Sequence, residues 1–130
     1  MPPLSRGQIA LRVGEGIRQL GISLLKEPED SEVRQLRVEK FHSCIVALDS
    51  LINSCREAKS MYASAPKIRQ AILDGGEQIS IIRGQVDNLL ISFLEGTVEY
   101  PDLGRRLLAL GQAVKLIDFL PPLPKEELQA

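Results

Sequence analysis

The sequence predicts an all-α protein, namely an antiparallel up-down-up-down four-helix bundle with two long central helices and two shorter outer ones. Apolar residues recur at spacings of three and four, and no stretch alternates with a period of two. Aromatic residues make up only 4% of the chain, which is scarce for a sheet protein. The 130 residues suffice for one domain with its own core. We expect that domain over 1–120, followed by a flexible proline-rich tail over 121–130.

The first helix is predicted from Ser5 to Lys26, with Ser5 as its N-cap. Its apolar stripe consists of Ile9, Val13, Ile17, Leu20 and Leu24. Pro28 interrupts this pattern, and the acidic stretch EPEDSE around it suits the N-terminus of a second helix, where the helix dipole favours negative charge.

The second helix carries apolar residues from Val33 towards Met61. It should end shortly before Pro66, because proline disfavours helical geometry at the residue that precedes it. Ser64 is then positioned to cap the third helix, which can accept a proline in its first turn.

The third helix is predicted to run without a break from Pro66 to Glu95, although Gly75 and Gly76 resemble a loop. Each glycine costs about 1 kcal/mol inside a helix. The helical phase nevertheless continues across them: Ile68, Ile72, Gly75, Ile79, Ile82, Val86, Leu89, Leu90 and Phe93. A loop would shift that register, so we place both glycines on the packed side of one helix.

The fourth helix is expected to begin at Asp102 as its N-cap and to end before Pro121 and Pro122. Its seam consists of Leu103, Leu107, Leu110, Val114 and Ile117. All three connections are short, so neighbouring helices should be antiparallel.

Five glycines recur at intervals of seven on the first and fourth helices: Gly7, Gly14 and Gly21, then Gly104 and Gly111. Residues seven apart on a helix differ by only about 20° around its axis, so each set forms a groove without side chains. We expect these grooves to allow close packing between the first and fourth helices, with a contact between copies of the chain as the alternative.

The glycines do not form a dinucleotide-binding loop. Counted from Gly14 and Gly16, the third glycine of a G-x-G-x-x-G motif would fall at position 19, which is Gln19. No predicted strand precedes the stretch either. A nucleotide cofactor is therefore not expected.

Unequal helix lengths predict an interaction surface. The second and third helices each span about 30 residues and the other two about 20, so both short helices should cover the same end of the long hairpin. The far tip, roughly 55–75, would then lack a covering layer. Its apolar residues are the predicted partner or oligomer interface: Met61, Tyr62, Ile68 and Ile72.

Two other groups of residues give weaker hypotheses. Glu39 and His42 match the Glu-x-x-His spacing of di-iron bundles, but the motif occurs only once, so no metal cofactor is predicted. A nucleic-acid surface would use Arg12, Arg18, Arg105 and Arg106. The net charge of −1 and the lack of aromatic stacking residues argue against it.

The cysteines and the hydropathy predict a reduced, cytoplasmic protein. Cys44 and Cys55 lie about 16 Å apart on one helix, too far for a disulfide bond. No apolar run approaches the roughly 20 residues that span a bilayer. The expected function is a non-enzymatic protein–protein interaction or assembly module, adaptor or chaperone-like and self-associating. The alternatives are a bundle metalloprotein or enzyme that uses Glu39 and His42, and a nucleic-acid-binding accessory protein that uses the four arginines.

Overall fold

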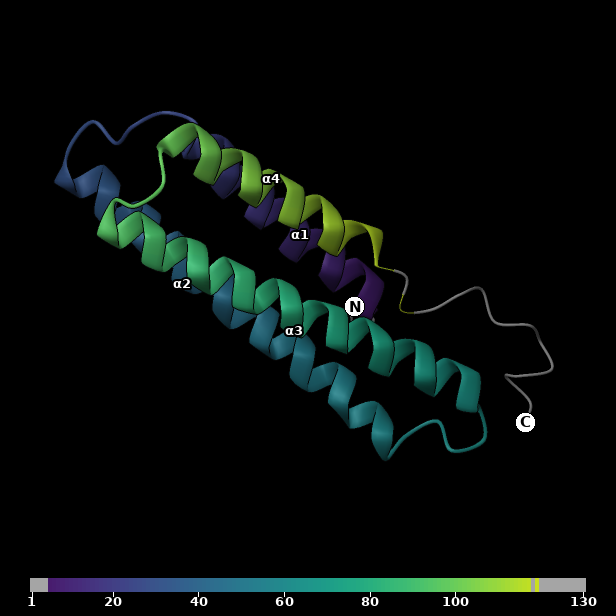
Figure 1. The fold of residues 1–130 in the computed structure, drawn as a ribbon. Coiled ribbons are helices and arrows are strands. Elements are labelled where there is room, and N and C mark those ends of the chain that lie inside the picture. Colours follow the sequence, from purple (N-terminus) through teal and green to yellow (C-terminus); the bar gives the residue numbers. More distant parts are fainter. Residues whose placement is uncertain (1–4, 118, 120–130) are drawn as a thin grey trace.

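The computed structural model describes residues 5–117 and residue 119, and these residues contain helices and no strands. In chain order the elements are α1 (Arg6–Ser23), α2 (Ser31–Arg56), the short 3-10 helix η1 (Glu57–Lys59), α3 (Pro66–Glu95) and α4 (Tyr100–Leu116). The predicted all-α, four-helix fold is confirmed (Figure 1). The proline-rich segment 121–130 lies outside the described residues.

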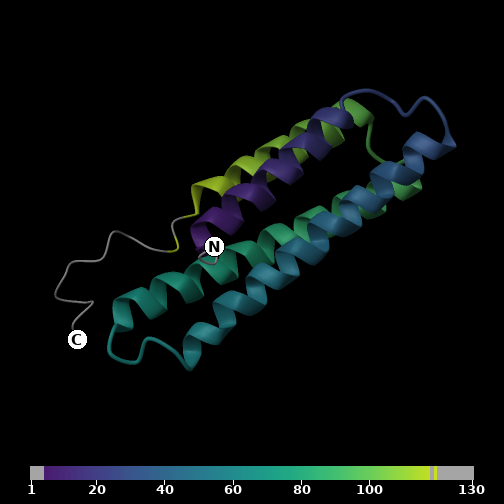
Figure 2. The same cartoon turned by 180° about the vertical axis from the view of Figure 1, so that it is seen from behind.

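The helices pack as two pairs, α1 with α4 and α2 with α3, and the pairs lie side by side (Figures 1 and 2). Thinner contacts of α1 with α2 and of α3 with α4 join the pairs. Gly14 of α1 lies against Gly111 of α4, and Gly21 against Gly104. Because the numbers rise in α1 as they fall in α4, these two helices are antiparallel.

A capping box starts α1 at the predicted residue. The Ser5 hydroxyl accepts a hydrogen bond from the Gln8 amide at 3.2 Å, and the Gln8 side chain accepts one from the Ser5 amide at 2.9 Å. The helix ends at Ser23 rather than at Lys26. Directly after it, the backbone amides of Leu24 and Leu25 donate to carbonyls three residues back. These bonds form a tighter turn than that of an α-helix, so the α-helix ends there.

The α3 helix passes unbroken through its glycine pair, as predicted. Both glycines make room for neighbours. A Cβ atom on Gly76 would lie 2.7 Å from the Cβ of Cys55 in α2, and one on Gly75 would lie 2.6 Å from two ring carbons of Phe119. Close packing, not a turn, accounts for the two glycines.

Other expected boundaries differ from the structure as well. The N-cap of α3 is Ala65 rather than Ser64, and it caps without a side-chain hydrogen bond. The α2 helix ends at Arg56, where η1 continues the chain as one tighter turn. The α4 helix ends at Leu116, ahead of the two prolines that were expected to stop it.

Asp102 is not the N-cap of α4. The helix begins at Tyr100, with Glu99 as its N-cap and Pro101 in its first turn. Backbone amides in the first turn of a helix have no acceptor within the helix, so a proline, which lacks the amide proton, removes no hydrogen bond there. Asp102 therefore lies inside the first turn, where it pairs with Arg105 at 2.5 Å. It favours this helix end through its negative charge rather than through capping.

The core is apolar throughout: among the described residues no polar or charged side chain is buried. A row of aromatic rings links three helices near the α3–α4 connection. The ring of Phe41 lies 5.6 Å from that of Phe93, which lies 5.9 Å from that of Tyr100. Three of the chain's five aromatic residues therefore lie together at one end of the bundle.

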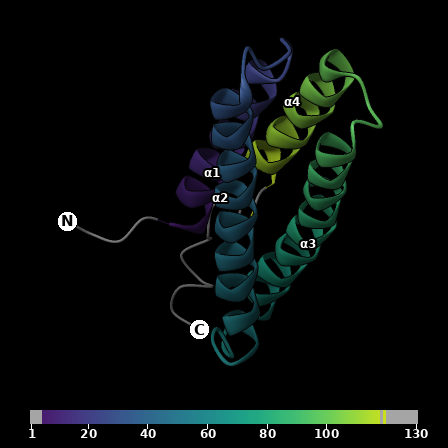
Figure 3. The ribbon, with the colours of Figure 1, turned by 90° about the vertical axis from the view of Figure 1, so that its left-hand side faces the viewer.

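The α2–α3 hairpin extends beyond α1 and α4 at the end where α2 joins α3 (Figure 3). We call residues 54–77 of this hairpin the tip. Phe119, only 1% exposed, packs against Gly75 in this segment. Ile68 and Ile72 are buried in the chain's own core, at 3% and 0% exposure, and are not free to meet a partner as the sequence predicted.

Phe119→Ala should lower the free energy of unfolding by about 3–5 kcal/mol, because it removes a buried ring and leaves a cavity beside Gly75. Urea denaturation followed by circular dichroism measures this change. Leu116→Ala is the matched control, since that side chain is 73% exposed and should change stability little. Equal effects of both substitutions would show that the chain after α4 does not pack on the tip.

Candidate functional site

Four of the five predicted glycines form the contact between α1 and α4. A Cβ atom on Gly14 would lie 2.7 Å from the carbonyl oxygen of Gly111, and one on Gly21 would lie 2.8 Å from that of Gly104. The reverse distances are 2.6 and 2.7 Å. Backbone meets backbone at both points, so any side chain there would force the helices apart.

Gly7 lies outside this seam. A Cβ atom there would meet only the Ser5 hydroxyl, at 3.9 Å. The register explains the difference. Gly7 precedes Gly14 by one heptad, so its counterpart would follow Gly111 by seven positions, past the last residue of α4 at Leu116.

A charged clamp spans α1 and α4 beside the glycines. Glu15 accepts hydrogen bonds from Gln19 at 2.9 Å, from Lys115 of α4 at 2.9 Å and from Arg18 at 2.8 Å. These bonds, with that from Gln19 the largest contribution, lower the pKa of Glu15 from 4.5 to about 2. Glu15 therefore stays ionised as the pH falls and continues to bind Lys115.

The tip leaves one large apolar side chain exposed. Met61 is 47% exposed, and Tyr62, which follows it, is half-buried with its backbone in the left-handed region at φ 59°. Arg6 of α1 donates to the Tyr62 hydroxyl at 3.4 Å and to the Ser54 carbonyl at 3.0 Å. Of the four predicted interface residues, Met61 is thus the one that projects freely.

Four basic residues lie on the same segment as Met61. Arg56, Lys59 and Lys67 are exposed, and Arg69 is partly exposed. Within the part of the chain that the structure describes, none of these four forms an ion pair. The tip therefore combines unpaired positive charge with an exposed thioether.

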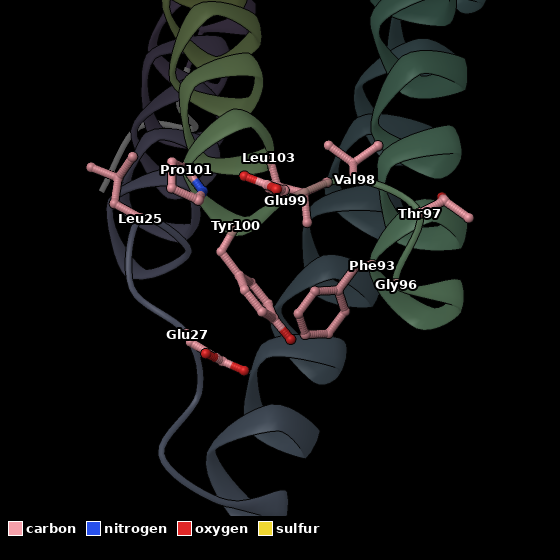
Figure 4. A pocket seen from close by; sticks show the side chains of 10 residues that line it. All are labelled: Leu25, Glu27, Phe93, Gly96, Thr97, Val98, Glu99, Tyr100, Pro101 and Leu103. Atoms are coloured by element: carbon pink, nitrogen blue, oxygen red, sulfur yellow. The ribbon is translucent and has the colours of Figure 1, made fainter.

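The opposite end holds a cavity of about 670 Å³, which sequence reasoning missed (Figure 4). It lies between the α1–α2 and α3–α4 connections and is lined by Leu25, Glu27, Phe93, Gly96, Thr97, Val98, Glu99, Tyr100, Pro101 and Leu103. Tyr100 meets Phe93 edge-on, and its ring stands between Phe93 and the Glu27 carboxylate in Figure 4. Glu27 and Glu99 are the charged residues of this lining.

Neither carboxylate of this cavity forms an ion pair with another described residue. Arg34 lies nearby with its guanidinium carbon 5.3 Å from the centre of the Phe93 ring, where it donates to the Leu94 carbonyl at 3.3 Å. The cavity therefore combines an aromatic ring and a few apolar side chains with two carboxylates that have no ion-pair partner, a combination that suits a positively charged group attached to an apolar chain.

The structure does not bring the other predicted residues together. Glu39 and His42 are exposed on α2 rather than directed into the bundle, and no group of three metal-ligating side chains occurs among the described residues. The four arginines lie apart, because Arg12 lines a groove between α1 and α2 while Arg106 lines one between α3 and α4. Arg18 and Arg105 pair with acidic residues of their own helices.

Both cysteines are free thiols in poorly solvated positions. Burial raises the pKa of Cys44 to about 11 and raises that of Cys55 as well. Both therefore remain protonated, which makes them poor nucleophiles at neutral pH. Within residues 5–117, no helix is long and apolar enough to cross a membrane.

Comparisons of the chain with protein-family models, with curated proteins and with solved structures gave no significant match. The function must therefore be inferred from the side chains themselves. The two ends of the long hairpin supply the sharpest contrast in surface chemistry.

Gly21→Ala should lower the free energy of unfolding by about 1–3 kcal/mol, because the added Cβ would meet backbone atoms of α4 at 2.8 and 2.9 Å. Gly84→Ala is the control. A Cβ atom on Gly84 would meet nothing within 4 Å, so alanine should stabilise α3 by about 0.5–1 kcal/mol. Thermal and urea unfolding of both variants measure the contrast. A stable Gly21→Ala variant would contradict the backbone contact.

Acid should weaken the fold through Glu15. Its folded pKa, about 2, lies below its ordinary value of 4.5, so its contribution is complete above pH 4.5 and is lost as the pH falls towards 2. Unfolding midpoints of the wild type and of Glu15→Gln should therefore converge over that interval. The control Glu29→Gln makes the same charge change at an exposed residue. The gap between its unfolding midpoint and that of the wild type should not close over the same pH interval. A constant gap for Glu15→Gln would rule out the clamp.

Proposed function

We propose that this chain is a non-enzymatic assembly module, adaptor or chaperone-like, that associates with further copies of itself. The observation that carries the proposal is the contrast between its two ends. The tip presents Met61 among basic residues, and the other end presents an aromatic cavity with an acidic rim. Each end thus offers surface of a kind that the other end complements.

The charge difference extends beyond the cavity. We call residues 24–38 and 93–106, where the α1–α2 and α3–α4 connections meet, the loop end. Its acidic residues Glu27, Glu29, Asp30, Glu32, Glu95, Glu99 and Asp102 outnumber the basic residues Lys26, Arg34, Arg37, Arg105 and Arg106. At the tip the basic residues Arg56, Lys59, Lys67 and Arg69 outnumber the acidic residues Glu57, Asp74 and Glu77.

Such ends attract one another at short range. Charges in water are screened beyond about 8 Å at physiological ionic strength, so the attraction acts mainly once the ends are close. Burial of Met61 and of the partly exposed Tyr100 ring then supplies the apolar contribution. A contact between two narrow ends is small, and interfaces below about 1,200 Å² are typically weak and transient. We therefore expect association that depends on protein concentration.

The two alternative functions gain no support from particular contacts. Glu39 and His42 lie at the surface without further ligands from other described residues. The four arginines do not share a face. The free thiols Cys44 and Cys55 support a reducing compartment, so we propose a cytoplasmic location.

The wild-type chain should show an average mass above that of a single chain, rising with protein concentration and falling as salt is added. Sedimentation or light scattering over a range of concentrations and salt measures both trends. The salt dependence follows from screening of the charged ends. A single-chain mass under all conditions would refute self-association, and a mass that rises with salt would point to a purely apolar contact.

A further inference from the structure

We propose that copies of this chain associate head to tail, with the tip of one copy seated in the loop-end cavity of the next. This inference rests on the proposed self-association and specifies its geometry. The cavity then binds the tip of a second copy of the chain, which offers the thioether of a methionine together with the ammonium groups of two lysines. Met61 is the side chain that enters, and Lys59 and Lys67 are the cations that meet the acidic rim.

The shape and chemistry of the cavity suit this occupant. Its volume of about 670 Å³ exceeds what one methionine side chain occupies, so part of the turn can enter as well. Tyr100 is the partly exposed ring of the lining, packed edge-on against the buried Phe93, and methionine sulfur makes favourable contacts with aromatic rings. Leu25 and Val98 add apolar surface from the two connections.

The tip has a matching arrangement of groups. Met61 lies in the connection between η1 and α3, with Lys59 two residues before it and Lys67 near the start of α3. Tyr62 is held by Arg6 from α1, which fixes the backbone next to Met61. The thioether is therefore presented on an anchored turn, which lowers the entropy lost when it binds.

The charges favour contact between a tip and a cavity over contact between two tips or between two cavities. Glu27 and Glu99 come from the two connections that border the cavity, and neither has a cationic partner among the described residues. Arg34 is already held over Phe93 and donates to the Leu94 carbonyl, and Arg37 donates to the Lys26 carbonyl at 2.7 Å. Two tips would repel each other, as would two acidic rims, so a contact between like ends is disfavoured.

Head-to-tail contacts have a consequence for the assembly. The tip and the cavity lie at opposite ends of the α2–α3 hairpin (Figure 1), so a bound copy leaves one end of each type free. Such a heterologous contact continues into an open chain unless its rotation closes a ring. A symmetric dimer, in which the same surface meets itself, would instead stop at two copies.

The test uses two variants that each block one end. The tip variant carries Lys59→Ser, Met61→Ser and Lys67→Ser, and the cavity variant carries Glu27→Lys and Glu99→Lys. All five residues are exposed, so both proteins should keep the helical content of the wild type. The matched control carries Arg12→Ser, Lys40→Ser and Val46→Ser, which removes the same charge and one exposed apolar side chain from the side of the bundle.

Each blocked variant alone should have the mass of a single chain, while the control should associate like the wild type. An equal mixture of the two variants should form a complex of one copy of each and stop there, because only the intact cavity of the tip variant and the intact tip of the cavity variant can meet. Light scattering, with one variant isotopically labelled for native mass spectrometry, measures the composition.

Other outcomes overturn the inference in distinguishable ways. A wild-type chain that is monomeric throughout refutes the proposed function and this contact together. If the wild type associates but the mixture forms no complex, self-association stands and the head-to-tail contact is wrong. If the control loses association while the blocked variants keep it, the copies meet through the side of the bundle instead.

Discussion

The backbone contact between α1 and α4 is the constraint on which the rest of the structure depends. Gly14 meets Gly111 and Gly21 meets Gly104 at distances that leave no room for a side chain. Because both contacts lie on one stripe of each helix, they fix the distance and the register of the pair at once. Glu15 then secures the edge of this seam by binding Lys115.

That register decides where the ends of the helices lie. It places the start of α4 beside the end of α1, so the α1–α2 and α3–α4 connections meet and enclose the cavity between them. At its other end, α4 finishes beside α3, so that Phe119, shortly after the helix, contacts Gly75. The acidic cavity and the contact of Phe119 with Gly75 are thus both consequences of the glycine seam.

The surface, not the core, carries the features that suggest a function. The described core holds no buried polar or charged side chain. The long hairpin extends well beyond the shorter pair at the tip (Figure 3), so the molecule has two unlike ends rather than two equivalent ones. We propose that these unlike ends, which carry opposite excess charge, meet each other in neighbouring copies of the chain.

The sequence by itself determined the four helices, the N-cap at Ser5 and the continuity of α3 through Gly75 and Gly76. These features depend on periodicity and on residues a few positions apart, which are visible along the chain. It also predicted the glycine seam, since residues seven positions apart lie on the same face of a helix. The start of α4 at Tyr100 was missed, because a proline in the first turn can replace a capping side chain.

Only the tertiary structure decided what is exposed. Ile68 and Ile72 have the pattern of an uncovered apolar face, and the sequence could not reveal that both are buried in the core or that Phe119 packs against Gly75. The cavity was equally hidden, since Glu27 and Tyr100 are far apart along the chain. Both depend on where separate segments meet in space, and helix periodicity fixes the face of each helix without fixing which distant segment packs against it.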